Sequence, residues 1–219
     1  MFLAITLARS GSKRLKNKNI MKIFNSNLLE ISYIRSIKSK FIKNIFLYTE
    51  SNKIALMGKK IGYTVPFKRP HQLAKDNSRS EAVILDFLKK IKKKFKYLIL
   101  LQPTSPLRTS KHIDNAINKY LRGKYDSLIS VSYSFKKHKF SVGIKKNYLI
   151  REKNKFNNKY LFINGAIYIS SIKKFLKNKS FFSRKTGFFL MPKKYSLDVD
   201  TKKDIQSLKK LFKNDKKIK

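Results

Sequence analysis

The chain has 219 residues, of which 53 are Lys or Arg and only 12 are Asp or Glu, so its formal net charge is +41. A hydrophobic content of 42% argues against a disordered chain, and zero cysteines exclude a disulfide framework, a thiolate metal site and a cysteine nucleophile. The sequence contains no run of about 18 apolar residues, so it predicts no membrane span. The apolar start, Met1 to Ala8, has no preceding basic segment and fits a buried first strand better than a signal peptide, so we expect a cytoplasmic protein.

The charge allows two interpretations. Basic patches bind nucleic acid by releasing counterions from the phosphate backbone, which would make the chain a nucleic-acid-binding protein. However, 44 of the 53 basic residues are Lys, spread from end to end, and only nine are Arg. Nucleic-acid surfaces usually concentrate their charge and use Arg, whereas AT-rich codons favour Lys, Asn, Ile, Phe and Tyr over Gly and Pro. We therefore favour coding bias as the explanation of the high lysine content. We still expect the positive electrostatic field of the protein to attract anionic ligands.

Strand-like and helix-like segments alternate through the first half of the chain. Short apolar runs predict strands, and apolar residues at helical spacing predict amphipathic helices between them. In chain order these are strand 2–7, helix 28–37, strand 45–48, helix 53–61, helix 80–95, strand 97–101 and helix 113–121. This alternation predicts an α/β fold with a doubly wound, mostly parallel sheet and helices on both faces.

The pattern changes after residue 134. From Phe135 to about Phe162 the chain is polar and hairpin-like, with turn signals at Lys146-Asn147 and Asn157-Asn158, so we predict an inserted arm. Beyond it we expect a strand at 166–169, a final strand at 196–199, a helix at 201–212 and a solvated tail at 213–219.

The first chemical motif is "LARSGSKRLKNKNI", Leu7 to Ile20, which follows the predicted first strand. In open α/β sheets ligands bind beyond the carboxyl ends of the strands. Gly11 between two serines allows backbone N–H groups to turn onto an anion. Basic residues surround that turn: Arg9, Lys13, Arg14, Lys16 and Lys18. Because the stretch matches neither the nucleotide P-loop nor the dinucleotide fingerprint, on its own it is equally well a basic surface turn.

Two further motifs border predicted strands. "LLQPTSPLR", Leu100 to Arg108, runs from a strand into a proline-fixed loop, with Gln102 placed to present its amide at the strand end. A proline-rich strand terminator would explain the prolines but not the glutamine. "NGAIYI", Asn164 to Ile169, is by itself an ordinary strand entry.

The fourth motif is "LDVDT", Leu197 to Thr201. Alternation puts Asp198 and Asp200 on one face of an extended segment. Carboxylate oxygens suit Mg²⁺, which takes one or two carboxylates plus substrate phosphates. The competing interpretation is that Asp200 caps the helix beginning at Thr201, and both can be true.

Together these stretches resemble the acylneuraminate cytidylyltransferases, the CMP-sialic acid synthetases and their relatives for legionaminic and pseudaminic acids. The similar stretches, in family order, are "LARSGSKRLKNKNI", "VPFKRPHQLAKDNSRS", "LLQPTSPLR", "NGAIYI" and "LDVDTKKDI". The resemblance implies a mixed-sheet α/β domain of the nucleotide-diphospho-sugar transferase type. It assigns residues 1–134 and 186–219 to this nucleotide-binding domain and 135–185 to an arm for dimerisation and sugar binding, in a homodimer.

The reaction that the resemblance implies is transfer of CMP from CTP to the anomeric hydroxyl of a nine-carbon acidic sugar, with release of pyrophosphate and with Mg²⁺ as cofactor. The implied nucleotide-binding residues are Ala8, Arg9, Gly11, Ser12, Lys18, Asn19, Arg69 and Ser80. The implied sugar-binding residues are Gln102, Lys139, Asn164, Tyr168, Phe181 and Phe182. Arg9 and Lys18 would act catalytically together with the metal-binding Asp198 and Asp200.

Some positions depart from the family pattern. Ser10 replaces a frequent Gly, Lys16 replaces a frequent Pro, and Glu50 stands where Asp is usual, at a position we expect to be peripheral to the chemistry. The basic residue expected before "NGAIYI" has three loose counterparts, which are Arg151, Lys153 and Lys155.

The alternatives that stay open concern the base and the substrate. Of the three histidines, only His138 is near the expected sugar site, and a metal-bound water could serve as the base instead. A related alternative is a cytidylyltransferase for the eight-carbon acid KDO. An unrelated alternative is a basic nucleic-acid-binding or scaffold protein on the same fold.

Overall fold

The computed structural model describes residues 1–12, 14–152, 155–156 and 158–214. Its centre is a mixed sheet in the strand order β2-β1-β3-β8-β4-β9. Pairing is parallel except at β8, which runs antiparallel to both β3 and β4. The strands of this path are β1 (Phe2–Leu7), β2 (Ile45–Tyr48), β3 (Tyr97–Leu100), β4 (Ser127–Ser134), β8 (Lys159–Ser171) and β9 (Thr186–Leu190). The predicted α/β class with a mixed, mostly parallel sheet is confirmed.

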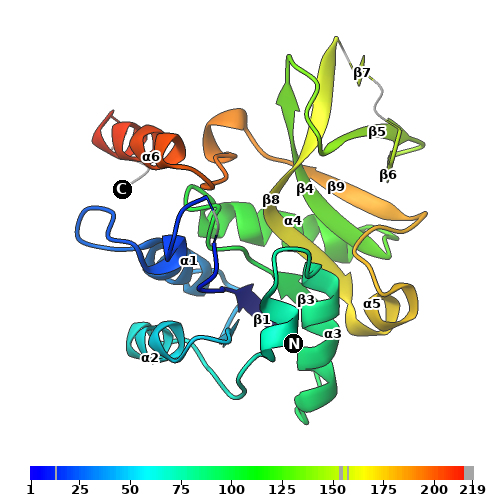
Figure 1. Ribbon diagram of the computed structural model, residues 1–219. Helices are drawn as coiled ribbons and strands as arrows, with labels where there is room; N and C mark the ends of the chain where they lie inside the picture. Colours follow the sequence, from blue (N-terminus) through cyan, green and yellow to red (C-terminus); the bar gives the residue numbers. More distant parts are fainter. Residues whose placement is uncertain (13, 153–154, 157, 215–219) are drawn as a thin grey trace.

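Helices cover both faces of the sheet (Figure 1). One hydrophobic cluster joins the sheet to α1 (Leu28–Ile37), α2 (Asn52–Ile61) and α4 (Ser110–Arg122). A second cluster joins the opposite face to α3 (Ser80–Lys90) and α5 (Ile172–Asn178). These two clusters bury the apolar stripes that predicted the helices.

Two helix boundaries differ from the predicted ones. α3 ends at Lys90 rather than Phe95, because the backbone of Ile91 turns extended after two lysines in the last turn. α4 begins at Ser110 rather than Ile113, because Thr109 and His112 form a capping box in which each side chain accepts a hydrogen bond from the other's backbone N–H.

The outer halves of β4 and β8 project beyond the helix-covered body and carry three short strands (Figure 1). These are β5 (Ser141–Lys145), β6 (Tyr148–Ile150) and β7 (Lys155–Phe156). The predicted turn at Lys146-Asn147 is confirmed, since both residues have positive φ between β5 and β6. Asn158 also has a positive φ, whereas Asn157 lies outside the described residues.

The projection is shorter than the predicted arm, 135–185. Residues 168–171 of β8 pair with β3 in the central sheet, and α5 packs on that sheet. The described residues between 134 and 163 therefore form the projecting strands and their loops, while 164–185 belong largely to the body.

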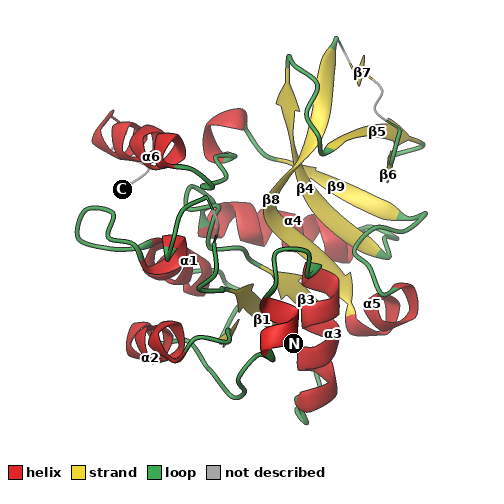
Figure 2. Ribbon diagram, viewed as in Figure 1, coloured by secondary structure: helices red, strands yellow, loops and turns green. Residues whose placement is uncertain are grey.

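The predicted final strand, 196–199, is wrong. This segment is extended but passes over the loop after β3 instead of lying beside a strand, and the Val199 N–H donates to the Thr104 carbonyl at 2.8 Å. It leads into α6 (Lys202–Asn214), which packs with Leu15, Ile23 and Leu28 in a third cluster. Figure 2 shows this loop-rich side of the sheet, where the motifs converge. Within the described ranges, no helix has the length and apolarity needed to cross a membrane.

Candidate active site

The loop after β1 is fastened by a buried carboxylate. Glu50, at the end of β2, accepts hydrogen bonds from the Ser10 backbone N–H at 2.7 Å and from the Ser10 hydroxyl at 2.8 Å, both on Oε1. Glu50 is only 5% exposed. Two of the three departures from the family pattern therefore contact each other, and Glu50 holds the loop although it lines neither cavity.

Polar groups in this loop are left for a ligand. A Cβ added at Gly11 would meet no atom within 4 Å, so the backbone there stays open. Ser12 Oγ and Asn19 Oδ1 are buried without a hydrogen-bond partner among the described residues. Because buried polar atoms are nearly always satisfied, these two indicate groups that a bound molecule completes.

Two cavities open beside the loop. The first, of about 170 Å³, is lined by Leu7, Arg9, Ser12, Lys18, Asn19, Arg69, Lys75, Asp76, Ser78, Ser80, Val83, Gln102, Pro103 and Thr104. The second, of about 360 Å³, is lined by Arg9, Ser12, Arg14, Leu15, Lys18, Asp76, Lys139 and Asp200. Four residues belong to both walls: Arg9, Ser12, Lys18 and Asp76. The first cavity thus adjoins a second one that is rich in cations.

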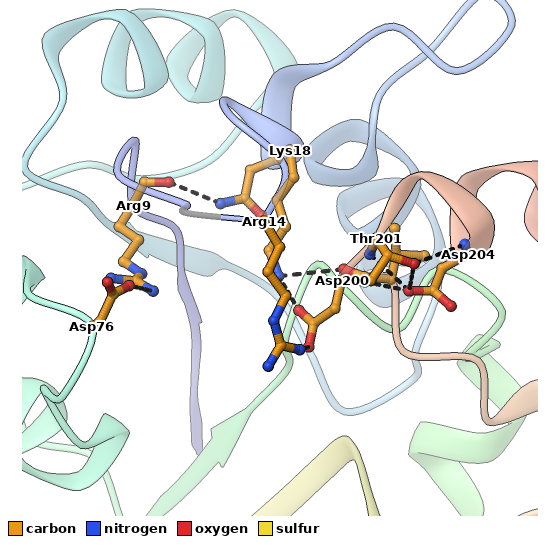
Figure 3. A network of polar contacts seen from close by, with 9 residues as sticks. Arg9, Arg14, Lys18, Asp76, Asp200, Thr201 and Asp204 are labelled. Carbon is orange, nitrogen blue, oxygen red and sulfur yellow. Dashed lines mark hydrogen bonds and ion pairs between the residues drawn. The ribbon is translucent and has the colours of Figure 1, made fainter.

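Ion pairs cross these walls (Figure 3). Arg9 Nη2 lies 2.5 Å from Asp76 Oδ1, and Arg9 Nη1 donates to the Ala74 carbonyl at 3.3 Å. Lys18 Nζ lies 2.5 Å from Asp200 Oδ1, and Arg14 Nη1 lies 3.8 Å from Asp200 Oδ2. Three of the cations that line these cavities, Arg9, Arg14 and Lys18, are thus paired with carboxylates.

Asp200 does not cap α6. The cap is Thr201, whose hydroxyl accepts a hydrogen bond from the Asp204 backbone N–H at 3.3 Å. The Asp204 carboxylate in return accepts from the Thr201 and Asp200 backbone N–H groups at 2.7 and 3.0 Å. The interpretation of Asp200 as the cap is therefore wrong, and its side chain is available to the second cavity.

The two aspartates flank a buried residue. Val199 is fully buried, so the extended backbone turns both Asp198 and Asp200 away from the core, as the alternation predicted, although no sheet is formed there. Burial would raise the pKa of Asp200, but the Lys18 hydrogen bond and charge, with Arg14 and Lys139, outweigh it and lower the pKa. Desolvation by the surrounding protein raises the pKa of Asp198, and repulsion from the Asp200 carboxylate raises that pKa further. A cation near both would relieve that repulsion.

The chain also matches a known protein family. A family model described as "Cytidylyltransferase" matches residues 3–218. This chain belongs to the cytidylyltransferase family.

Several curated relatives resemble this cytidylyltransferase over most of its length. It is 32% identical to the post-translational flagellin modification protein B of Campylobacter coli, over 96% of this chain and 94% of that protein. It is 31% identical to the CMP-N,N'-diacetyllegionaminic acid synthase of Legionella pneumophila, over 96% and 95%. Against the N-acylneuraminate cytidylyltransferase of Escherichia coli it is 31% identical over 93% of this chain, which spans 50% of that relative's length.

Solved structures share the fold. A CMP:2-keto-3-deoxy-manno-octonic acid synthetase complexed with CTP superposes with a TM-score of 0.77 at 13% identity, covering 97% of this chain and 98% of that one. At this identity the likeness concerns the fold alone.

The nucleotide-binding residues expected from the sequence gather in this cytidylyltransferase. Arg9, Ser12, Lys18, Asn19, Arg69 and Ser80 all line the first cavity. Ala8 is buried in the backbone of the loop, and its N–H donates to the Tyr48 carbonyl at 3.3 Å. Arg69 Nε is buried without a partner within the described chain, which is a further group for a ligand to satisfy.

The expected sugar-binding residues divide into two sets. Gln102 lines the first cavity, and Lys139, from the projecting strands, lines the second. Asn164 instead is buried, and its side-chain amide hydrogen-bonds to neighbouring serines. It accepts from Ser130 Oγ at 2.6 Å and donates to Ser132 Oγ at 3.0 Å. Asn164 thus lies inside β8, bonded to neighbouring serines, and lines neither cavity.

The remaining aromatic candidates pack on their own subunit. The Tyr168 ring lies 5.4 Å from that of Phe181, which is 2% exposed and also packs on Phe175 at 4.8 Å. Phe181 is therefore covered by residues of its own chain and has almost no exposed surface for a neighbouring subunit to contact. The Arg151 guanidinium lies 4.6 Å from the Phe182 ring centre, so Arg151 stacks there instead of reaching a cavity. Lys153 lies outside the described residues, as does the side chain of Lys155.

None of the three histidines lines the two cavities. His138 packs on Phe162 at 4.9 Å, and burial followed by the Lys139 charge lowers the pKa of His138. His112 caps α4. The geometry therefore gives no histidine the position of a general base.

The sequence did not predict the contacts of three residues. Asp76, which holds Arg9, stood unremarked within "LAKDNS". The contact of Glu50 with Ser10 was not predicted, because 40 positions separate the two residues. Arg108, the last residue of "LLQPTSPLR", is fully buried and donates to the carbonyls of Gln102 and Ala166 and to the hydroxyls of Ser32 and Ser36. It ties the loop after β3 to β8, a role that no local pattern reveals.

Proposed function

We propose that this cytidylyltransferase transfers CMP from CTP to the anomeric hydroxyl of a nine-carbon acidic sugar (N-acetylneuraminate, legionaminate or pseudaminate), with release of pyrophosphate. The observation that carries the proposal is the pair of cavities that share Arg9, Ser12, Lys18 and Asp76. The printed names of the relatives, which include synthases of CMP-linked nine-carbon acids, support the acceptor class.

The first cavity suits the nucleoside and the second its phosphates. Asn19, Arg69 and Ser80 offer polar groups for a cytidine, while Arg9, Lys18 and Arg14 offer cations for a triphosphate. In the proposed step the sugar oxygen bonds to the α-phosphorus, the bond from that phosphorus to the bridging oxygen breaks, and pyrophosphate leaves with the electron pair. The sugar hydroxyl's proton passes to solvent. Arg9 and Lys18 stabilise the charge that builds on the leaving oxygens.

The donor chemistry of the second cavity fits Mg²⁺. Among the described residues no group of three or more His, Cys, Asp or Glu side chains could hold a metal alone. Two neighbouring carboxylates, one of which raises the pKa of the other, do suit Mg²⁺, which usually completes its shell with substrate phosphates. We expect Asp198 and Asp200 to hold it, and the ion when bound would neutralise phosphate charge. Lys18, already 2.5 Å from Asp200, keeps that carboxylate oriented.

Lys139 is the group we assign to the sugar's carboxylate. It extends from the projecting strands into the cavity that also contains Asp200, and its charge lowers the pKa of Asp200. Gln102, which lines the adjoining first cavity, would hydrogen-bond the sugar. An ammonium that meets the acceptor's carboxylate favours acidic sugars over neutral ones.

We further propose a cytoplasmic homodimer. The projecting strands expose large apolar side chains, with Phe135 at 73% and Phe140 at 51%. Exposed aromatic rings on a protruding element are typical of a surface that another chain covers. The CTP that the reaction consumes belongs to the cytoplasm.

The test is pyrophosphate release from CTP and Mg²⁺ at low salt, with N-acetylneuraminic, legionaminic, pseudaminic and KDO acids offered separately. Release with a nine-carbon acid supports the proposal and identifies the substrate. Release with KDO alone would replace the acceptor by an eight-carbon acid. CTP binding without release for any acid would overturn the acceptor class.

A further inference from the structure

Arg9 is occupied by a carboxylate at the boundary between the two cavities. Its Nη2 lies 2.5 Å from Asp76 Oδ1, and both residues line both cavities. The Asp76 carboxylate therefore sits where a triphosphate that extends from one cavity into the other would place a phosphate oxygen. Figure 3 shows this pair apart from the Lys18–Asp200 pair.

The Arg9–Asp76 pair is open enough to exchange. The two side chains are 28% and 37% exposed, and ion pairs at such exposure hold weakly. A triphosphate offers Arg9 more negative charge and several acceptor oxygens, and contacts between guanidinium and phosphate are among the stronger hydrogen bonds. Phosphate should therefore displace the carboxylate when the nucleotide enters.

Arg9 also touches the wall that carries Asp76. Its Nη1 donates to the carbonyl of Ala74 at 3.3 Å, two residues before Asp76. Ser78 and Ser80 follow in the same wall and line the first cavity. Asp76 thus belongs to the segment that borders the nucleoside, while Arg9 belongs to the loop that borders the phosphates.

We propose that Asp76 is a positioning residue that competes with the nucleotide's phosphates for Arg9. It holds the guanidinium at the boundary while the site is empty, yields it to CTP, and takes it back as pyrophosphate leaves. The proposal rests on the function proposed above, because it requires CTP as the ligand. Its consequence is that Asp76 weakens the binding of both CTP and pyrophosphate, and so favours product release.

Calorimetric titration of CTP and of pyrophosphate, with Mg²⁺ and without sugar, tests this role. Asp76→Asn should lower both dissociation constants about two- to fivefold, the range expected for a weak competing ion pair. Asp76→Ser should change them in the same direction. Asp126→Asn is the matched control, because Asp126 pairs with Lys174 at 2.8 Å directly before β4 and lines neither cavity. It removes the same charge and should leave both constants unchanged.

An Arg9→Gln background separates competition for Arg9 from bulk charge. There, adding Asp76→Asn should no longer tighten binding, because the guanidinium for which Asp76 competes is gone. In turnover, Asp76→Asn should also increase inhibition by pyrophosphate by the same factor as its dissociation constant falls.

Three results would overturn the role of Asp76. They are unchanged or weaker CTP binding in both Asp76 variants, equal tightening in Asp126→Asn, or undiminished tightening in the Arg9→Gln background. If the unsubstituted protein binds no CTP, the proposed function itself fails. That outcome is distinct, because it is seen before any variant is compared.

Discussion

Asp200 Oδ1 lies 2.5 Å from Lys18 Nζ, although the two residues are 182 positions apart in the chain. Lys18 also donates to the Val199 carbonyl at 3.3 Å, so the loop after β1 is joined twice to the segment before α6. The second cavity consequently has lining residues from both ends of the sequence.

Replacing Asp200 should abolish turnover and spare the fold. Asp200→Ala removes the carboxylate that orients Lys18 and that we assign to Mg²⁺, so we expect kcat to fall by about 10²–10³-fold or more. Its side chain is 43% exposed, and exposed ion pairs contribute at most about 1 kcal/mol, so the free energy of unfolding should change little. Steady-state kinetics and urea denaturation measure the two effects.

Asp126→Asn provides the control for Asp200→Ala, since it removes a paired carboxylate remote from the cavities. Normal turnover in Asp200→Ala would refute the metal assignment. A function that survives Asp198→Ala and Asp200→Ala but weakens with salt would indicate a basic binding protein instead.

The contact between Ser10 and Glu50 should set the affinity for CTP. Glu50→Ala removes the acceptor of both Ser10 hydrogen bonds, leaving the part-buried backbone N–H of Ser10 unpaired. We expect KM for CTP to rise about tenfold and the free energy of unfolding to fall by about 1–3 kcal/mol. CTP titration and urea denaturation check these values.

Ser10→Gly is the milder partner of Glu50→Ala, because the backbone N–H can still donate to Glu50 while the hydroxyl is lost. In the double variant Ser10→Gly should have no additional effect, since its acceptor is already gone. Additive losses would mean that Glu50 acts on the site by another route.

The sequence predicted the sheet class because strand and helix periodicities are local properties. It predicted the members of the first cavity because Arg9, Lys18 and Gln102 follow strands whose carboxyl ends meet at one edge. It failed at 196–199, where the alternation is real but the segment lies over Thr104 and pairs with no strand. It also could not tell that Asn164 turns inward, because that depends on serines from β4 and the residue 196 loop.

Arg108 should be a major contributor to stability. Arg108→Met would leave the Ala166 carbonyl, which accepts from Nη1 at 2.9 Å, without that donor inside the core. We expect the free energy of unfolding to fall by about 2–4 kcal/mol, as measured by urea denaturation. Arg122→Met, at an exposed position near the end of α4, is the matched control. Equal stability of the two variants would show that the buried guanidinium of Arg108 does not stabilise the fold.

His112 should make stability depend on pH. Burial, with the charges of Arg108, Arg35 and Lys111, lowers the pKa of His112 to about 4 from 6.5. Between these values the unfolded chain binds a proton that the folded chain does not, so stability falls as the pH decreases from 6.5 toward 4. The slope from this group is at most about 1.4 kcal/mol per pH unit.

His112→Gln keeps a side chain that can complete the capping box but does not titrate. Urea denaturation at several pH values should show a shallower decline for this variant between pH 6.5 and 4. Parallel curves for the two proteins would contradict the assignment of this pH dependence to His112.

The exposed ring of Phe135 should mark the subunit contact. Phe135→Ser removes a side chain that is 73% exposed on the projecting strands, and we expect it to shift the molecular mass in light scattering from dimer toward monomer. Leu56→Ser, 62% exposed on α2, should leave the mass unchanged. A dimer unaffected by Phe135→Ser, or a monomeric unsubstituted protein, would place the contact elsewhere or remove it.

The most direct test of the central claim is phosphorus NMR of CTP, Mg²⁺ and each nine-carbon acid incubated with the protein. Attack at the α-phosphorus predicts that the three CTP resonances disappear together, replaced by pyrophosphate and a single phosphodiester resonance from the CMP-linked sugar. Formation of CDP and inorganic phosphate, or an unchanged spectrum with every nine-carbon acid, would contradict it.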